Sequence, residues 1–283
     1  MPFFLASKRK PSWGSFMRRG RRSWPIIVGG SHRSGTTLVR RLLNGHPHIF
    51  CPPEIKFHKD LLGQFPNDPL AHGRLGRSIA ALALPAETWL DEFGRAFCRC
   101  YDLATARAGK QRWADKNPEN ALNAGHWHRL LKGRMFFIMV VRHPLDVISS
   151  MAEVKMDKVI PSTVEGRAAH VRDYVAAGLT FAAQHNRISA VLRYEDVVSD
   201  PERAFRPVLD MSGERFADTM LRDLGSDAYG QGLEDPKARG RAELSGESVG
   251  RWRFDLTGPE VATAKAVVEP MALALGYNLA ASA

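Results

Sequence analysis

An apolar run that leads through a glycine-rich turn into a helix constrains this chain more than any other stretch. Residues 25–38 read PIIVGGSHRSGTTL, with β-branched residues before the turn and apolar periodicity after it. In a strand–loop–helix layout of this kind, successive backbone N–H groups and a helix N-terminus converge on an anion. The stretch therefore predicts a phosphate-binding loop between a buried strand and a helix.

Residues within this loop indicate which kind of phosphate compound it binds. Gly30 and Gly35 have the spacing of the nucleotide-triphosphatase loop GxxxxGK[ST], but Thr36 replaces the lysine that reaches the β- and γ-phosphates. Arg33 instead places a planar guanidinium inside the loop, which suits two oxyanion contacts. We expect a phosphate-like ligand other than ATP; the alternative is a glycine-rich turn without a ligand.

Charge is distributed unevenly along the 283 residues. Residues 1–53 contain ten Lys or Arg and no acid, so the whole net charge of +10 lies in the N-terminal fifth. Seven of these basic residues precede the first predicted strand: Lys8, Arg9, Lys10, Arg18, Arg19, Arg21 and Arg22. We expect residues 1–24 to form a flexible basic arm and residues 25–283 to form a single domain.

Composition also bears on location and partners. No stretch has the length of a membrane span or the layout of a secretory signal, and Cys51, Cys98 and Cys100 lack zinc or redox spacing, so we expect a cytoplasmic protein. Apolar residues among the charges of the arm favour contact with the inner membrane face or a protein partner, the alternative being a solvated extension. The balanced charge after residue 53 argues against nucleic acid as a partner.

Strands alternate with helices along the rest of the chain. Strands are predicted over 25–30, 49–51, 111–114, 135–141 and 190–192. Helices are predicted after residue 35, within 55–110, from residue 119, over 145–151 and 164–187, from Ser199 with capping-box chemistry, and from Thr257. Trp89, Phe93 and Phe97 recur at four-residue spacing, as on a helix that faces a core. The alternation predicts an α/β fold with a P-loop-like parallel sheet flanked by helices on both faces.

The predicted strands all end at polar or charged residues. These strand ends are Arg33 in the loop, Glu54, Lys116, Arg142 and Arg193–Tyr194. Ligands of an open parallel sheet bind beyond the carboxyl ends of its strands, so we expect one site at this edge. Arg142 stands where an ATPase commonly has a metal-binding aspartate, which disfavours a kinase. His126 and His128 have no third ligand nearby, so no metal site is expected.

Four motifs, GGSHRSGTTLVRRLL, VVRHPLDVISS, LRYEDVVSDPE and VGRWR, resemble the sulfotransferases that use 3′-phosphoadenosine 5′-phosphosulfate (PAPS). The resemblance runs from about residue 26 to the C-terminus and is weakest over 56–110. It implies the sulfotransferase fold and a reaction that requires no metal. The residues that would bind PAPS are Arg33, Ser34, Gly35, Thr36 and Thr37 at the 5′-phosphosulfate, Arg142 and Ser150 at the 3′-phosphate, and Tyr194, Ser245, Ser248 and Arg251 over the nucleotide.

Within this family the motifs are most similar to those of the tyrosylprotein sulfotransferase branch. That branch also has Arg followed by SGTTL in the loop, an arginine at the Arg40 position and His-Pro at His46–Pro47. Its catalytic glutamate falls at Glu54 and a lysine falls at Lys116. The resemblance therefore implies that Glu54 and Lys116 belong to the catalytic site.

Two features depart from that branch. This chain has Val154 at the position where that branch has a further nucleotide-binding arginine, so Lys155 or Arg193 is expected to substitute for that arginine. The second departure is that the sequence shows no stretch with the layout of the secretory signal that a Golgi-type enzyme needs.

The residues suggest a mechanism for sulfuryl transfer. Arg33 and the loop amides would hold the migrating group, and Lys116 would neutralise the leaving phosphate oxygen. Glu54 would take the acceptor proton; His58 is the rival base, and Glu54 could instead be a helix-start acid. The favoured acceptor is a tyrosine in an acidic peptide, with a carbohydrate, glycolipid or small-molecule hydroxyl as the alternative and a P-loop nucleotide kinase as the remote one. A second copy of the chain, forming a homodimer, is a further partner that the sequence leaves open.

Overall fold

The computed structural model describes residues 20, 23–56, 77, 80–154, 159–222, 224 and 244–280, without the side chains of residues 86, 87, 89 and 90. The charged residues of the predicted basic arm, the rival base His58 and Lys155 lie outside these residues. Among the helices so described, none is long and apolar enough to cross a membrane.

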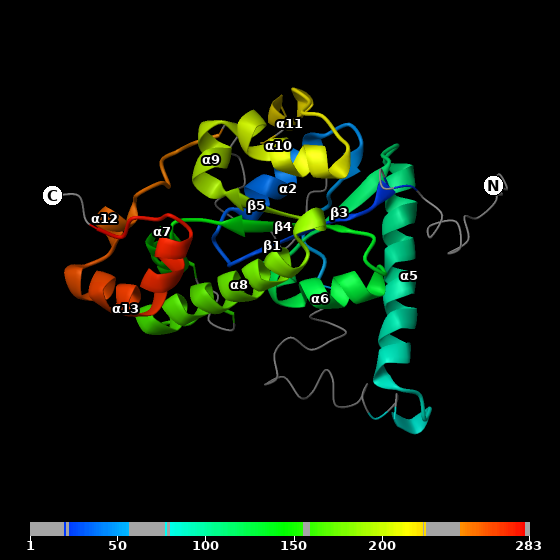
Figure 1. The fold of residues 1–283 in the computed structure, drawn as a ribbon, viewed down its shortest axis with the longest axis horizontal. Helices are drawn as coiled ribbons and strands as arrows, with labels where there is room; N and C mark the ends of the chain where they lie inside the picture. Colours follow the sequence, from blue (N-terminus) through cyan, green and yellow to red (C-terminus); the bar gives the residue numbers. More distant parts are fainter. Residues whose placement is uncertain are drawn as a thin grey trace, which may run out of the picture.

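Five parallel strands form the centre of the fold (Figure 1), in the order β2–β3–β1–β4–β5. The strands are β1 (Ile26–Gly30), β2 (Ile49–Phe50), β3 (Arg112–Lys116), β4 (Phe136–Val141) and β5 (Ser189–Arg193). In the central pairings Val28 of β1 lies opposite Lys116 of β3, and Gly30 lies opposite Val140 of β4. All five predicted strands are therefore confirmed within one or two residues, and their carboxyl ends meet at one edge of the sheet.

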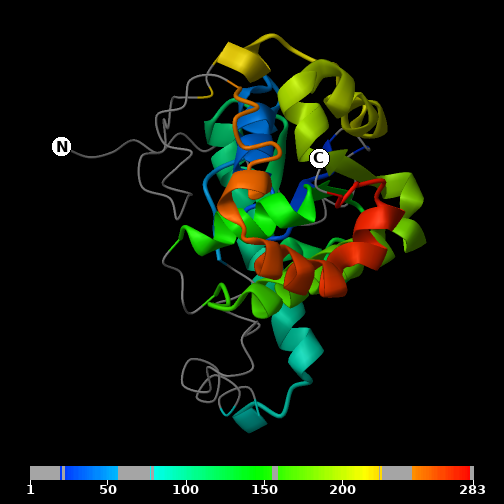
Figure 2. The same ribbon diagram turned by 90° about the vertical axis from the view of Figure 1, so that its left-hand side faces the viewer.

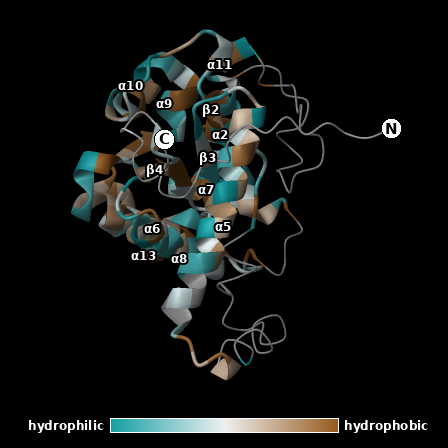
Figure 3. Ribbon diagram, turned by 90° about the vertical axis from the view of Figure 1, so that its right-hand side faces the viewer, coloured by the Kyte–Doolittle hydropathy of each residue, from teal (hydrophilic) through white to brown (hydrophobic). Residues whose placement is uncertain are grey.

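Helices cover both faces of the sheet (Figure 1). One face carries α6 (Asn120–Leu130), α7 (Pro144–Ala152), α8 (Val164–Gln184) and α13 (Gly258–Ala274); the other carries α2 (Thr36–Gly45), α9 (Tyr194–Ser199), α10 (Pro201–Ser212) and α11 (Thr219–Arg222). Ile27 belongs to the core under α6 and α8, whereas its neighbours Ile26 and Val28 belong to the core under α2 and α10. Figure 3 shows the resulting contrast between a hydrophobic β4 inside and hydrophilic residues on the outer surface of helices such as α8. The predicted α/β architecture is confirmed.

Helix α5 (Ala86–Arg107) packs against β3, but its first half extends beyond the sheet (Figure 1). Phe97 therefore reaches the core and lies 6.5 Å from Trp127 between ring centroids, whereas Phe93 is 46% exposed. The prediction that Phe93 faces the core is wrong, because the helix has no sheet beneath it at that level.

Two predicted helix starts have different outcomes. Thr257 and Glu260 form the predicted capping box of α13. The second start, predicted within Ser199–Glu202, is confirmed, but its cap is not the serine of a capping box: Ser199 is the last residue of α9, and Asp200 is the N-cap of α10, with its side chain accepting a hydrogen bond from Arg203 N at 3.0 Å. Aspartate caps as well as serine, and from this position it places Pro201 in the first turn, where proline is favoured.

Candidate active site

Two residues in the left-handed region shape the loop after β1. Arg33 has φ 68° and Gly35 has φ 94°, and Ser34 Oγ donates a 2.7 Å hydrogen bond to Ser31 O. A Cβ atom at Gly35 would lie 2.3 Å from the ring of Tyr194. Position 35 therefore requires glycine both for its backbone conformation and for the packing of this ring.

Arg142 joins the loop from the end of β4. Its Nη1 donates to Arg33 O at 3.1 Å, its guanidinium lies 4.6 Å above the Tyr194 ring, and Arg33 Nε donates to Ser150 Oγ at 3.1 Å. The buried Nε of Arg142 has no hydrogen-bond acceptor among the residues that the structure describes. Four predicted site residues therefore meet here, and one of them has a spare donor, as expected of a site that binds an anion.

The second half of the site surrounds Glu54, which follows β2. Lys116 at the end of β3 donates to Glu54 Oε1 and lies 3.2 Å from Thr37 Oγ1, and Lys56 Nζ lies 2.7 Å from Glu54 Oε2. Burial raises the pKa of Glu54, but Lys116 and Lys56 outweigh burial and hold this pKa below its usual value. Glu54 is therefore ionised at neutral pH, which is the state that a general base needs.

Polar residues after β3 hold the segment that carries Glu54. Asn117 Nδ2 donates to Ile55 O at 3.0 Å and to Asp115 Oδ1 at 3.0 Å, and Asn120 Nδ2 donates to the same oxygen at 2.7 Å. Asp115 is almost wholly buried. The sequence did not single out Asp115, Asn117 or Asn120, although a run of polar residues directly after a strand is a signal that can identify such a group.

Asp146 in the first turn of α7 holds the chain near Ser248. Its Oδ2 accepts from Gly250 N at 2.8 Å and its Oδ1 accepts from Trp252 N at 3.0 Å, so that α12 (Trp252–Asp255) lies beside α7 (Figure 2). Arg142 donates to the carbonyl oxygen of Ser248. The stretch predicted to close over the nucleotide is thus held at the site through its backbone, by Asp146 and Arg142. The position of Asp146, four residues after Arg142, is a sequence signal that could have indicated this role.

The side chains of two other predicted residues, Ser245 and Arg251, have partners within or near their own stretch. Ser245 Oγ accepts from Glu247 N at 3.2 Å, and Arg251 pairs with Glu153 and with Asp255, at 2.6 Å from the latter. Among the residues that the structure describes, neither side chain forms a hydrogen bond or ion pair with the loop.

Arg193 contacts the C-terminal segment of the chain. Its guanidinium lies 4.2 Å from the centroid of Tyr277 and donates to Leu275 O at 2.9 Å. The expectation that Arg193 substitutes for the arginine missing at Val154 therefore stays a prediction; in this structure the C-terminal segment binds its guanidinium.

One group of side chains has the spacing of a metal site among the described residues: the ligand atoms of His46, His48 and Glu214 lie within 4.8 Å of one another. His46 Nδ1 accepts from His48 N at 3.1 Å, and its Nε2 lies 2.9 Å from Arg215 O, to which it can only donate. Both ring nitrogens of His46 are therefore used, and Glu214 pairs with Arg112 at 2.9 Å. The cluster connects the loop before β2 to the end of α10 without a metal.

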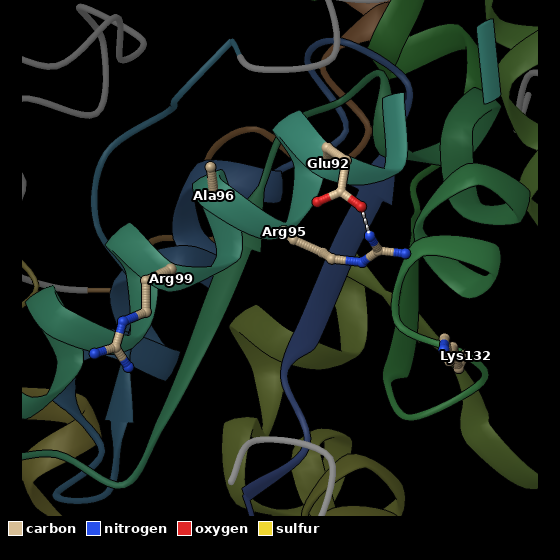
Figure 4. Close-up of a pocket in the computed structure, with 5 residues that line it drawn as sticks. All are labelled: Glu92, Arg95, Ala96, Arg99 and Lys132. Carbon is tan, nitrogen blue, oxygen red and sulfur yellow. Dashed lines mark hydrogen bonds and ion pairs between the residues drawn. The ribbon is translucent and has the colours of Figure 1, made fainter. Parts of the chain in front are cut away.

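A cavity of about 570 Å³ lies apart from this site (Figure 4). Glu92, Arg95, Ala96 and Arg99 of α5 and Lys132 line it, and Glu92 pairs with Arg95. Lys132 follows α6, which runs from the carboxyl end of β3 to the amino end of β4. The cavity therefore lies toward the opposite edge of the sheet and contributes nothing to the Glu54 site.

The fold and site define a class of protein: a parallel α/β domain with a P-loop-like turn after β1, two arginines at that turn and a carboxylate–lysine pair beside it. The family model described as the sulfotransferase family matches residues 25–218. The chain belongs to the sulfotransferase family.

Individual relatives are distant. The chain is 25% identical to nodulation protein NoeE of Sinorhizobium fredii over 277 residues, which cover 88% of this chain and 65% of NoeE. It thus spans less than two thirds of the length of this curated relative. The sulfotransferase domain of the Synechococcus PCC 7002 olefin synthase has a TM-score of 0.60 at 23% identity, covering 88% of this chain and 94% of that domain.

The sulfotransferase domain of the curacin biosynthetic pathway has a TM-score of 0.61 at 19% identity, covering 91% of this chain and 99% of that domain. Both structures share the predicted sulfotransferase fold with this chain. None of these three relatives is described as a tyrosylprotein sulfotransferase, so assignment to that branch stays a prediction.

Proposed function

We propose that this chain transfers the sulfuryl group of PAPS to an acceptor hydroxyl. The observation that carries the proposal is the meeting of Arg33, Arg142, Lys116 and Glu54 at the carboxyl edge of one parallel sheet. The two arginines and the loop suit an anionic donor, since Arg142 has an unused buried donor beside the loop. PAPS supplies the activated sulfate when it is bound.

Each of these residues has a part in the transfer. Arg33 and the loop amides orient the sulfate, and Glu54 takes the proton from the acceptor hydroxyl as its oxygen attacks sulfur. The bond between sulfur and the 5′-phosphate oxygen breaks, and Lys116 neutralises the charge on that leaving oxygen. Arg142 and Ser150 would hold the 3′-phosphate.

A tyrosine phenol is the acceptor that we favour. Two lysines hold the pKa of Glu54 below its ordinary value, so the carboxylate is a weak base. A phenol has a pKa of about 10, well below that of an aliphatic hydroxyl, and asks less of such a base. The motif similarity at Arg33, Glu54 and Lys116 favours the same acceptor. A carbohydrate, glycolipid or small-molecule hydroxyl is the alternative.

Labelled PAPS and three acceptors test this function. We expect sulfate incorporation into a tyrosine peptide with acidic neighbours and none into its Tyr→Phe version. Equal incorporation into both peptides contradicts the tyrosine acceptor, and incorporation into a glycan or lipid alone selects the alternative. Binding of magnesium ATP in place of 3′-phosphoadenosine 5′-phosphate, with no transfer to any acceptor, contradicts sulfotransferase activity itself.

Arg142→Ala is expected to weaken donor binding more than it slows transfer. A charge-assisted contact to the 3′-phosphate contributes about 1.5–3 kcal/mol, so affinity for 3′-phosphoadenosine 5′-phosphate should fall roughly 10- to 150-fold. Isothermal titration measures this affinity. Arg172→Ala, which removes an arginine from the exposed surface of α8, is the control and should bind normally. Unchanged affinity in Arg142→Ala removes Arg142 from the donor site.

A further inference from the structure

Charged side chains of alternating sign form a row that begins at Lys116 and continues through Glu54, Lys56 and Glu119. Lys56 Nζ lies 2.7 Å from Glu54 Oε2 and 3.1 and 3.3 Å from the two carboxylate oxygens of Glu119. His32 of the phosphate-binding loop continues the row, with Nε2 3.6 Å from Glu119 Oε1. No motif in the sequence pointed to Lys56 or Glu119.

The first member of this row has two tasks in the proposed reaction. In this structure Lys116 is bound to Glu54 and to Thr37. During transfer its charge is needed at the leaving phosphate oxygen. When Lys116 turns to the donor, Glu54 loses part of the attraction that keeps its buried carboxylate ionised and oriented. A second cation is then required.

Lys56 can supply that charge because Glu119 holds it in place. A lysine side chain has many accessible rotamers, so a free Lys56 would seldom point at Glu54. Glu119 is 4% exposed and contacts Lys56 with both of its oxygens. Burial raises the pKa of Glu119, but His32 and Lys56 outweigh burial and hold this pKa far below its usual range. Glu119 therefore stays anionic throughout the pH range of the reaction.

We propose that Lys56 and Glu119 are a positioning pair that keeps Glu54 ionised and correctly aimed while Lys116 serves the donor. The proposal rests on the proposed function. Charges that face Glu54 are those of Lys116 at the end of β3 and Lys56 on its own segment; Asp115 opposes ionisation, and Glu119 acts through Lys56. Neither Lys56 nor Glu119 touches the donor in this account.

Lys56→Met and Glu119→Gln have different expected signatures. Lys56→Met removes the positive charge beside Glu54, so the pKa of Glu54 rises. The acid limb of the kcat–pH profile then moves to higher pH, and kcat at pH 6 falls about tenfold or more. Glu119→Gln keeps the lysine but releases its side chain, so Lys56 points at Glu54 for only part of the time. We therefore expect a smaller upward shift of the acid limb than in Lys56→Met, together with a loss of kcat that persists at high pH because Glu54 is less well aimed. Lys56→Arg should restore most of the wild-type rate.

Two measurements separate this role from a structural one and from failure of the proposed function. Affinity for 3′-phosphoadenosine 5′-phosphate should be unchanged in both variants; a parallel loss of affinity means a structural role and overturns the proposal. The carbon-13 titration of the Glu54 carboxyl, assigned with Glu54→Gln, needs no acceptor and should move to higher pH in Lys56→Met. An unmoved titration overturns the proposal even if wild type transfers sulfate. If the Glu54 titration moves but the wild-type enzyme transfers no sulfate, the effect of Lys56 on Glu54 is established and the proposed sulfotransferase function is rejected instead.

Discussion

Glu54→Gln is expected to lower kcat by about 10²–10⁴-fold while affinity for 3′-phosphoadenosine 5′-phosphate stays near the wild-type value. The amide cannot take the acceptor proton, but its oxygen can still accept a hydrogen bond from the buried Lys116. This substitution therefore disturbs the fold less than Glu54→Ala, which would leave a buried ammonium without its partner. Steady-state transfer to the best acceptor, together with isothermal titration, measures the two effects.

The pH dependence of the wild-type enzyme provides a second check on Glu54. Its pKa is lower in the folded protein than in a free peptide, so the base is active above that folded value and is lost as the pH falls through it. Glu202→Gln, at an exposed position in the first turn of α10, is the control and should keep the full rate. Wild-type activity in Glu54→Gln would transfer the role of base to His58.

Lys116→Met is expected to reduce kcat by about 10²–10³-fold, since it removes the charge that neutralises the leaving oxygen. The side chain is fully buried, and methionine keeps its length and much of its volume. Glu54 also loses the stronger of its two cationic neighbours, so its pKa rises and the acid limb of the rate profile moves to higher pH.

A matched variant makes this result specific. Lys132→Met removes an exposed lysine that lines the cavity at the other edge of the sheet (Figure 4) and should leave both kcat and the acid limb unchanged. If Lys116→Met lowers donor affinity and kcat in equal proportion and leaves the acid limb in place, Lys116 binds the donor rather than acting on the leaving oxygen.

Regular patterns explain why the fold was predictable from the sequence. Seven apolar residues at 135–141 have one stable arrangement in a chain of this kind, a strand buried on both faces, and the structure has β4 there. Parallel topology then fixes the place of the site, because Glu54 follows β2 and Lys116 ends β3, and these two strands are neighbours. Strand order and polar strand ends together bring these two residues into contact.

Partnerships of single side chains were less predictable. Nothing in the local sequence distinguishes Lys56 from a solvated lysine, and its two carboxylate partners come from positions 54 and 119. Arg193 stands at the carboxyl end of β5 as expected, yet the C-terminal segment binds its guanidinium. Such contacts depend on how segments that are distant in the sequence pack together, and local sequence periodicity carries no information about that packing.

The attachment of residues 54–56 has a consequence for how substrate specificity can evolve in such an enzyme. Each of the three residues is held by the chain at or just after β3: Glu54 by Lys116, the carbonyl of Ile55 by Asn117, and Lys56 by Glu119. The proposed base is thus anchored from the sheet side by residues 115–119, none of which belongs to the stretch directly after Lys56. Changes in that stretch can therefore accumulate while Glu54 keeps its contact with Lys116.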